Sequence, residues 1–106
     1  MVSMLYVTFA SKSDAVMVAE KLLAENLIAC ANILEGSTSI YRWKGKTERQ
    51  QEVILLAKTT SEKVEKSMRR VKELHGYDLP CVLSFNADTG LPEFMDWVAG
   101  EVVRYE

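Results

Sequence analysis

Residues 28–60 restrict the possible folds of this chain more than any other segment. They predict two long β-strands that fold back on each other around Lys44-Gly45-Lys46, because the central glycine accepts the positive φ of a tight hairpin. The first strand, from Ile28 to Lys44, has 17 residues; at about 3.3 Å per residue it would span roughly 56 Å. A compact domain of 106 residues has a radius of gyration of about 13 Å and a diameter of roughly 33 Å. The hairpin must therefore bend, project from the domain, or pair with another copy of the protein.

The predicted hairpin changes character along its length. Val53–Ala57 is apolar on both faces, as in a central strand covered on each side, whereas Thr47–Gln51 is wholly polar. Gly36 interrupts the first strand and predicts a bulge or bend. Beyond it, the period of two separates two sets of side chains on opposite faces: Thr38, Ile40 and Arg42, and Ser39, Tyr41 and Trp43. We therefore predict a core base and an outer arm, defined here as residues 38–51, that carries aromatic side chains.

The remaining elements complete an α+β fold. Hydrophobic spacing and capping residues predict a strand at 3–9, a helix at 13–25 between Ser11 or Ser13 and Asn26, a helix at about 61–75 opened by a capping box at Thr59-Thr60-Ser61-Glu62, a strand at 79–85 and a third helix at 92–104. The order is βαββαβ with an extra C-terminal helix, which predicts a ferredoxin-like sandwich with a long hairpin between its second and third strands. The third helix is expected to cover part of the other face of the sheet or one edge.

Size and composition predict a single domain, residues 1–106, of ordinary globular type. The chain is 48% hydrophobic and 26% charged, with a net charge of −2 that gives no reason to expect nucleic acid binding. A basic cluster on the second helix has glutamates interleaved and indicates a solvated face; it comprises Lys66, Arg69, Arg70 and Lys72. We find no apolar run long enough for a membrane span and no signal-peptide pattern, so the cytoplasm is the expected location.

The two cysteines are expected to be reduced, buried and structural. Cys30 and Cys81 both lie in apolar, strand-like segments, and a reducing compartment disfavours a disulfide. The sequence neighbours of Cys30 supply no positive charge that would lower its pKa.

Catalytic motifs are absent from the sequence, but five residues are candidates for other roles. His75, the single histidine, stands at a helix end and has either a capping role or a ligand or proton-transfer role. Tyr41 and Trp43 would be exposed on a projecting arm, so we expect them to contact a neighbouring subunit or a ligand. Glu52 and Lys58 have even spacing and share one face, so they form an interface ion pair or part of a polar cleft. No enzymatic activity is predicted.

Several motifs together resemble the CutA family of divalent-cation tolerance proteins. They are Ala29-Cys30-Ala31-Asn32, the Gly36–Lys46 segment GSTSIYRWKGK, Glu52-Val53, Lys58-Thr59-Thr60, His75-Gly76-Tyr77 and Trp97. The resemblance covers nearly the whole chain. It implies a ferredoxin-like homotrimer whose long hairpins pack around a threefold axis, and a role in tolerance to copper or other divalent metals.

The resemblance also implies where a ligand would bind. The inter-subunit cleft of the family maps onto Trp43, Glu52, Lys58 and Tyr77, with His75 as a metal ligand. No cofactor is required, although a divalent ion such as Cu²⁺ or a small ligand is expected in the cleft. The copper site of some members maps onto Thr8, Leu74 and His75, which retain one of three ligands, and Gly76 replaces the usual proline. The alternative is a small-molecule-sensing trimer that acts through a protein partner.

Overall fold

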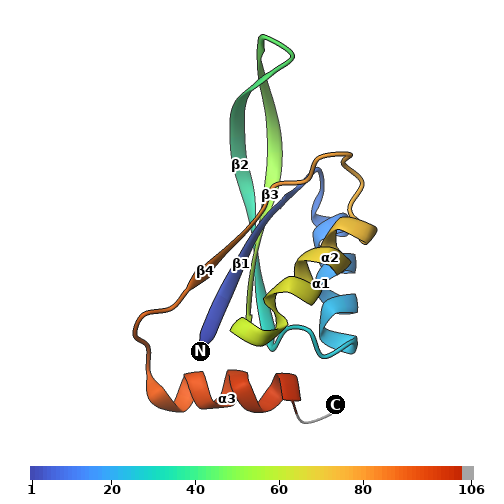
Figure 1. Cartoon of the computed structure of the whole chain (residues 1–106). Helices are drawn as coiled ribbons and strands as arrows, with labels where there is room; N and C mark the ends of the chain where they lie inside the picture. The colour runs from blue at the N-terminus through green and yellow to red at the C-terminus, as the bar shows by residue number, and fades with distance from the viewer. Residues whose placement is uncertain (104–106) are drawn as a thin grey trace.

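The computed structural model describes residues 1–103 and contains four strands and three α-helices within them. In chain order (Figure 1) these are β1 (Val2–Phe9), α1 (Lys12–Ala24), β2 (Cys30–Trp43), β3 (Lys46–Thr60), α2 (Val64–Leu74), β4 (Val82–Asn86) and α3 (Pro92–Val103). The predicted third helix extended to Arg104, which lies outside the described residues. None of the helices in residues 1–103 is long and apolar enough to cross a membrane.

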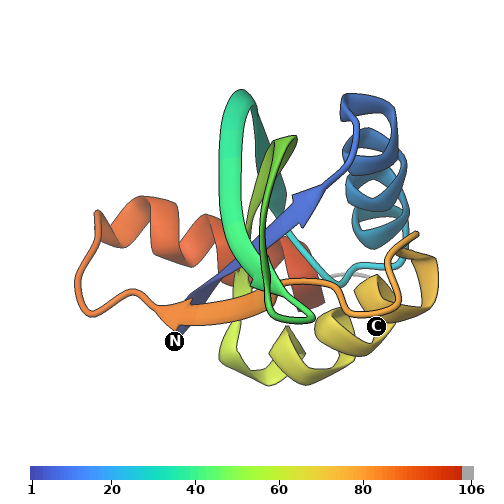
Figure 2. The ribbon, with the colours of Figure 1, turned by 90° about the horizontal axis from the view of Figure 1, so that it is seen from above.

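The strands form one antiparallel sheet in the order β2-β3-β1-β4. This order, with α1 and α2 as the two crossover helices, is the predicted ferredoxin-like α+β arrangement. Figure 2 shows α1 and α2 on one side of the sheet and α3 on the other. The fold prediction is therefore confirmed for the single chain.

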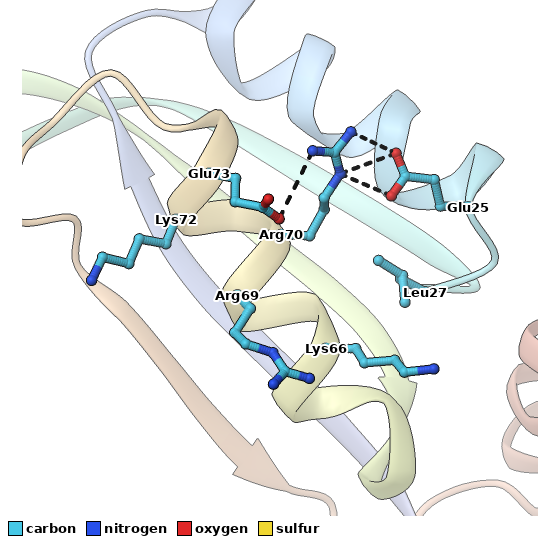
Figure 3. A pocket seen from close by; sticks show the side chains of 7 residues that line it. All are labelled: Glu25, Leu27, Lys66, Arg69, Arg70, Lys72 and Glu73. Atoms are coloured by element: carbon cyan, nitrogen blue, oxygen red, sulfur yellow. Dashed lines mark hydrogen bonds and ion pairs between the residues drawn. The ribbon is translucent and has the colours of Figure 1, made fainter.

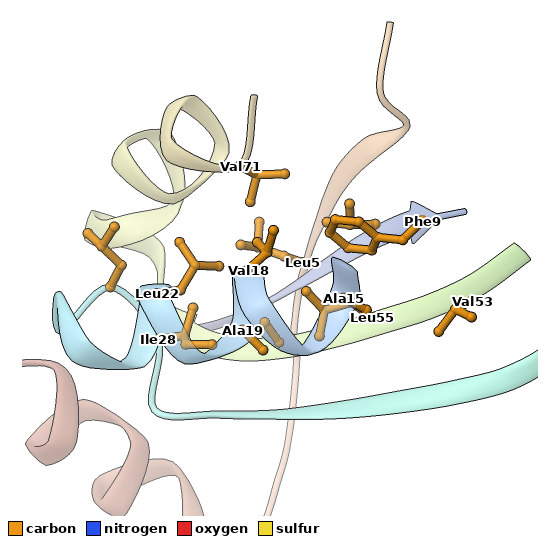
Figure 4. Close-up of a cluster of buried hydrophobic side chains, with 13 residues drawn as sticks. Leu5, Phe9, Ala15, Val18, Ala19, Leu22, Ile28, Val53, Leu55 and Val71 are labelled. Atoms are coloured by element: carbon orange, nitrogen blue, oxygen red, sulfur yellow. The ribbon is translucent and has the colours of Figure 1, made fainter. Parts of the chain in front are cut away.

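The main core lies between the sheet and the two crossover helices. Alternate residues of β1 and β3 point into it, because successive side chains of a strand face opposite ways. Figure 4 shows these strand residues meeting the apolar stripe of α1 and Val71 of α2. The fully buried members include Leu5, Val7, Phe9, Val18, Leu22, Leu55 and Val71.

The opposite face of the sheet is only partly covered. α3 packs across the end of the sheet away from the arm (Figures 1 and 2), where Val98 and Val102 are buried with Val2 and Ala29. The prediction that this helix covers part of the second face is correct. The rest of that face, termed the open face here, bears the exposed apolar side chains of Leu34, Leu83 and Phe85.

The hairpin projects from the domain, as its length required. The principal extents are 45 × 26 × 21 Å and the radius of gyration is 14.4 Å, so the molecule is longer than the compact shape of roughly 33 Å expected for its size. The arm extends well beyond the helices in Figure 1. Lys44 and Gly45 have φ of 50° and 80°, which gives the two-residue turn with both central φ positive that matches strand twist. A register shift between Leu34 and Ser37 confirms the bulge predicted at Gly36, whose φ is 85°.

Two helix boundaries differ from the predictions. Ser11 caps α1 by accepting a hydrogen bond from the Asp14 N–H, but the C-cap is Glu25, and Asn26 is the next residue, in the left-handed region with φ 58°. The capping box predicted before the second helix is wrong. Thr60 makes no capping bond, and a 3-10 turn at Ser61–Lys63 precedes the α-helix.

The prediction of two buried thiols is also corrected. β4 begins at Val82 rather than Leu79, so Cys81 lies before the strand and is exposed. Cys30 is half-buried and pairs across the sheet with Lys58. Burial raises the pKa of the Cys30 thiol, and the positive charge of Lys58 opposes that rise. Sequence neighbours alone missed this cross-strand charge.

Candidate functional site

A cleft of about 580 Å³ lies on the open face, at the foot of the arm. β1, the two hairpin strands and the connection from α2 to β4 all contribute to it. The lining residues are Tyr6, Thr8, Ser39, Ile40, Tyr41, Trp43, Gln50, Glu52, Tyr77, Asp78, Leu79 and Cys81. The cleft therefore joins the domain to the arm.

The bulge at Gly36 decides which residues of β2 reach this cleft. Before the bulge, Leu34 pairs with Ile54 and shares its face; after it, Ser37 pairs with Glu52. One additional residue in β2 exchanges the two faces of the strand. Ser39, Tyr41 and Trp43 share one face, as predicted, and the bulge places that face on the side of Glu52.

A chain of hydrogen bonds leads from the arm to the carboxylate of Glu52. The Tyr41 hydroxyl donates to Gln50 Oε1 (3.3 Å), and Gln50 Nε2 donates to the Tyr77 hydroxyl (2.9 Å). Tyr77 in turn donates to Glu52 Oε2 (2.8 Å). In each bond the donor belongs to the residue farther from Glu52 along this series, so the series ends with Glu52 as an acceptor. An ionised carboxylate fills that position because it only accepts hydrogen bonds.

The carboxylate of Glu52 stays ionised although the residue is buried, with only 7% of its surface exposed. Burial alone would raise the pKa of Glu52, but hydrogen bonds from Ser39, Tyr77, Gln50 and Thr8 outweigh it and hold the pKa below its ordinary value. Conversely, burial, together with the hydrogen bond to this carboxylate and its charge, raises the pKa of Tyr77 to about 12. Tyr77 therefore remains a protonated donor, and the cleft contains a fixed negative charge at neutral pH.

His75 contacts the backbone of two cleft residues, Thr8 and Tyr77, and so stabilises this arrangement. Its Nε2 is 2.7 Å from the carbonyl oxygen of Thr8, which can only accept, so Nε2 carries the proton. Its Nδ1 accepts from the Tyr77 backbone N–H at 3.0 Å. The ring stacks on Phe9 with centroids 4.5 Å apart and contacts Tyr77. Both ring nitrogens are thus engaged, and His75 positions Tyr77.

The structure brings three of the predicted ligand-binding residues together and separates one. Trp43, Glu52 and Tyr77 line the cleft. Lys58 lies on the same face as Glu52 but six positions along β3, about 20 Å away at strand spacing, and its Nζ donates to Asn32 Oδ1. The role of Lys58 as a cleft residue stays a prediction that would need a second subunit.

Sequence reasoning missed Gln50 and Ser39 as functional candidates and named Thr8 only as a position of the copper site of some family members. Gln50 stands within the polar Thr47–Gln51 run, where no pattern distinguishes it from its neighbours. The available signal was its even spacing with Glu52, which puts both on one face of β3. Thr8 approaches the cleft from a strand distant in sequence.

One chain does not assemble a metal cage from the residues described. Within residues 1–103, no three histidine, cysteine, aspartate or glutamate side chains are grouped closely enough to hold a metal ion. The cleft offers Glu52, Asp78 and Cys81 as possible donors. A metal ion here would need further ligands from outside this chain or from water.

A larger hollow of about 810 Å³, between the end of α1 and α2, is a weaker candidate. Arg70 donates to both carboxylate oxygens of Glu25 at 2.9–3.1 Å and lies 3.9 Å from Glu73. The hydrogen bond from Arg70 holds the pKa of Glu25 below its ordinary value, although burial opposes it. Figure 3 shows Lys66, Arg69 and Lys72 pointing apart. This surface therefore joins two helices, and its cations do not converge on a ligand.

Comparison with known proteins finds one family over nearly the whole chain. The family model described as CutA1 divalent ion tolerance protein matches residues 3–101. This chain belongs to the CutA family. A Divalent-cation tolerance protein CutA from Thermus thermophilus is 41% identical over 92 residues, which cover 87% of this chain and 89% of that protein.

Solved CutA structures share the fold almost throughout. CutA from Xylella fastidiosa superposes with a TM-score of 0.93 at 36% identity, covering 95% of this chain and 97% of that one. A protein from Archaeoglobus fulgidus, described as a periplasmic divalent cation tolerance protein CutA, gives a TM-score of 0.93 at 36% identity, over 96% and 99% of the two chains. The family resemblance seen in the sequence motifs is confirmed.

Proposed function

We propose that this protein acts in divalent-cation tolerance as a cytoplasmic homotrimer without enzymatic activity. In this proposal, each subunit contributes the cleft at the foot of its arm, and a neighbouring copy completes it. The cleft binds a divalent cation, such as copper, or a small ligand. The observation that carries the proposal is the ionised, nearly buried carboxylate of Glu52 at the junction of domain and arm.

The exposed surface supports assembly with another copy. The arm presents Ile40, Tyr41 and Trp43, and the open face beside it presents Leu83 and Phe85, all substantially exposed in the single chain. Exposed apolar side chains on both the arm and the open face favour an interaction site there. A long exposed hairpin also invites pairing unless another chain covers it.

The available donors support a ligand shared between subunits. Glu52 and Asp78 supply carboxylates and Cys81 supplies a thiol, which are donor types for several divalent ions. Copper or zinc sites also favour imidazole, but both nitrogens of His75 are engaged within the chain. We therefore assign His75 a positioning role and expect the missing ligands from a second copy.

Light scattering tests the assembly. At micromolar concentration we expect three times the 12.0 kDa mass of one chain. Changing Ile40 or Trp43 on the arm to aspartate should shift the mass towards the monomer, because a buried unpaired charge costs several kcal/mol. Wild-type protein at the mass of one chain would contradict the proposed trimer.

Titration calorimetry with copper and zinc tests the site. We expect Glu52→Gln to weaken binding at least about tenfold, equivalent to ~1.4 kcal/mol. Glu48→Gln removes the same charge from an exposed position on the arm outside the cleft lining and is the matched control. Equal affinity in wild type and His75→Ala would exclude His75 as a ligand, and equal affinity in wild type and Glu52→Gln would contradict the site.

A further inference from the structure

The charge of the cleft is unbalanced. Of the twelve residues that line it, the charged ones are Glu52 and Asp78, both acidic. The hydrogen-bond donors around Glu52 are the neutral groups of Ser39, Tyr77, Gln50 and Thr8. These donors stabilise the carboxylate, but they leave a net negative potential in a partly enclosed space. A bound positive charge would be favoured there because clefts with low-dielectric walls focus such a field.

Aromatic rings form much of the wall around this charge. Tyr6 and Tyr77 come from the domain, and Tyr41 and Trp43 come from the arm. The two arm residues are 40% and 47% exposed in the single chain and line the cleft, so a ligand bound in the cleft would contact them. A cation over the face of such a ring gains about 0.5–2 kcal/mol, with tryptophan the best partner.

The same features favour an organic cation over a bare metal ion. A divalent metal needs several close oxygen, nitrogen or sulfur ligands, and the described residues hold no group of three suitable side chains. The oxygens of Glu52 already accept bonds from protein donors, and aromatic walls cannot replace the water shell of a metal. A substituted ammonium ion is weakly hydrated on its carbon side and needs only one charged partner.

We propose that the natural ligand class of this cleft is a small organic ammonium ion with an apolar body. Its charge would lie near Glu52, and its carbon skeleton would contact Trp43 and Tyr41. The inference rests on the proposed function in that it takes this cleft to be the ligand site, and it names the chemical class of the ligand.

The test compares three probes that share one ring and differ in charge: benzylammonium, benzyl alcohol and benzoate. Binding to ¹⁵N-labelled full-length protein is followed by NMR from the indole N–H signals of Trp43 and Trp97. A Trp97→Phe variant, changed on α3 away from the cleft, assigns the two signals. We expect benzylammonium to shift the Trp43 signal saturably, with benzyl alcohol at least about tenfold weaker and benzoate weaker still.

Two variants test whether the carboxylate of Glu52 is the source of the preference for a cationic ligand. Glu52→Gln should reduce the preference for benzylammonium over benzyl alcohol to about twofold or less, because a neutral amide offers no charge to the ammonium. Glu48→Gln should retain the preference, since it removes an equal charge outside the cleft. The wild-type comparison among probes decides the proposal even if Glu52→Gln does not fold.

Zinc chloride added to the same sample separates this inference from the proposed function. A Trp43 shift with zinc but equal affinity for benzylammonium and benzyl alcohol would overturn the organic-cation inference and leave the cleft as a ligand site. No Trp43 shift with any probe or with zinc would overturn both. A preference for benzylammonium that persists in Glu52→Gln would also overturn the inference.

Discussion

The base and the arm of the hairpin belong to the same two strands but depend on different physics. In the base, Val53, Leu55 and Ala57 of β3 are buried against α1, α2 and β1. In the arm, Lys46–Arg49 are all exposed, and the strands are joined mainly by their own ladder. Burial stabilises the base, whereas turn geometry and register define the arm. No residue of the arm is buried in the single chain, which leaves its surface free for the proposed assembly with a second copy.

The junction between the two regions explains why the site lies there. At the pair Ser37 and Glu52 the strands leave the cover of the helices, and the bulge has just exchanged the faces of β2. A carboxylate at this point is buried enough to be held by four donors and still borders the open cleft. Neither the interior of the base nor the tip of the arm provides both conditions.

The largest expected contrast is between truncations in the two regions. Leu55 is 0% exposed in the base, and Ile40 is 63% exposed on the arm. Leu55→Ala should lower the free energy of unfolding by about 2–5 kcal/mol, since it removes buried methyl groups and leaves a cavity. In the unassembled chain, Ile40→Ala should change it by less than about 0.5 kcal/mol. Urea unfolding monitored by circular dichroism at one fixed protein concentration measures both.

Repeating the measurement at several concentrations separates the chain from its assembly. If a second copy covers the arm, the effect of Ile40→Ala becomes larger as the protein concentration rises and disappears on dilution, because assembly stabilises the folded state by mass action. A concentration-independent loss at Ile40 as large as that at Leu55 would show that the arm is part of the core of its own chain.

Most of the fold could be predicted because its signals are local. The length of the 28–60 segment, the polar run before Val53 and the glycines at 36 and 45 together gave the projecting hairpin, its bulge and its turn. These features work through backbone conformation and periodicity, which a sequence displays directly. The helix stripes likewise identified the faces that pack on the sheet.

The candidate site was predicted less completely because its contacts are not local. The bond from Gln50 to Tyr77 joins residues from different elements, and within the single chain Lys58 shares a face with Glu52 but does not line the cleft. The location of Cys81 depended on where β4 begins, which differed by three residues from the prediction. Side-chain partners across a sheet follow from register, and one bulge alters every later pair.

A smaller effect is expected from the charge at the junction. Because the pKa of Glu52 is lowered by folding, its ionised form stabilises the protein above the ordinary value of 4.5, and this contribution is lost as pH falls through the lowered pKa. Glu52→Gln should cost about 1–3 kcal/mol at pH 7, from weakened hydrogen bonds to a formerly charged group. Its stability should also decline less than that of wild type below pH 4.5.

Urea midpoints between pH 7 and pH 3 measure this difference, with Glu48→Gln on the arm as the control. We expect the control to follow the wild-type curve, since Glu48 is exposed. Parallel curves for wild type and Glu52→Gln would mean that the junction carboxylate does not contribute to acid sensitivity.

The smallest effects should come from three glycines that differ only in backbone conformation. Gly36 at the bulge and Gly45 at the tip have positive φ, whereas Gly100 lies within α3, and an added Cβ meets no atom within 4 Å at any of them. Alanine at Gly36 or Gly45 should therefore cost about 1 kcal/mol through backbone strain alone, and alanine at Gly100 should stabilise by about 0.4–1 kcal/mol through helix propensity and unfolded-state entropy. Urea unfolding measures all three. A Gly45→Ala variant as stable as wild type would indicate that the tip of the arm adopts another turn, while a loss at Gly36 well above that at Gly45 would indicate that the bulge also fixes the buried register of the base.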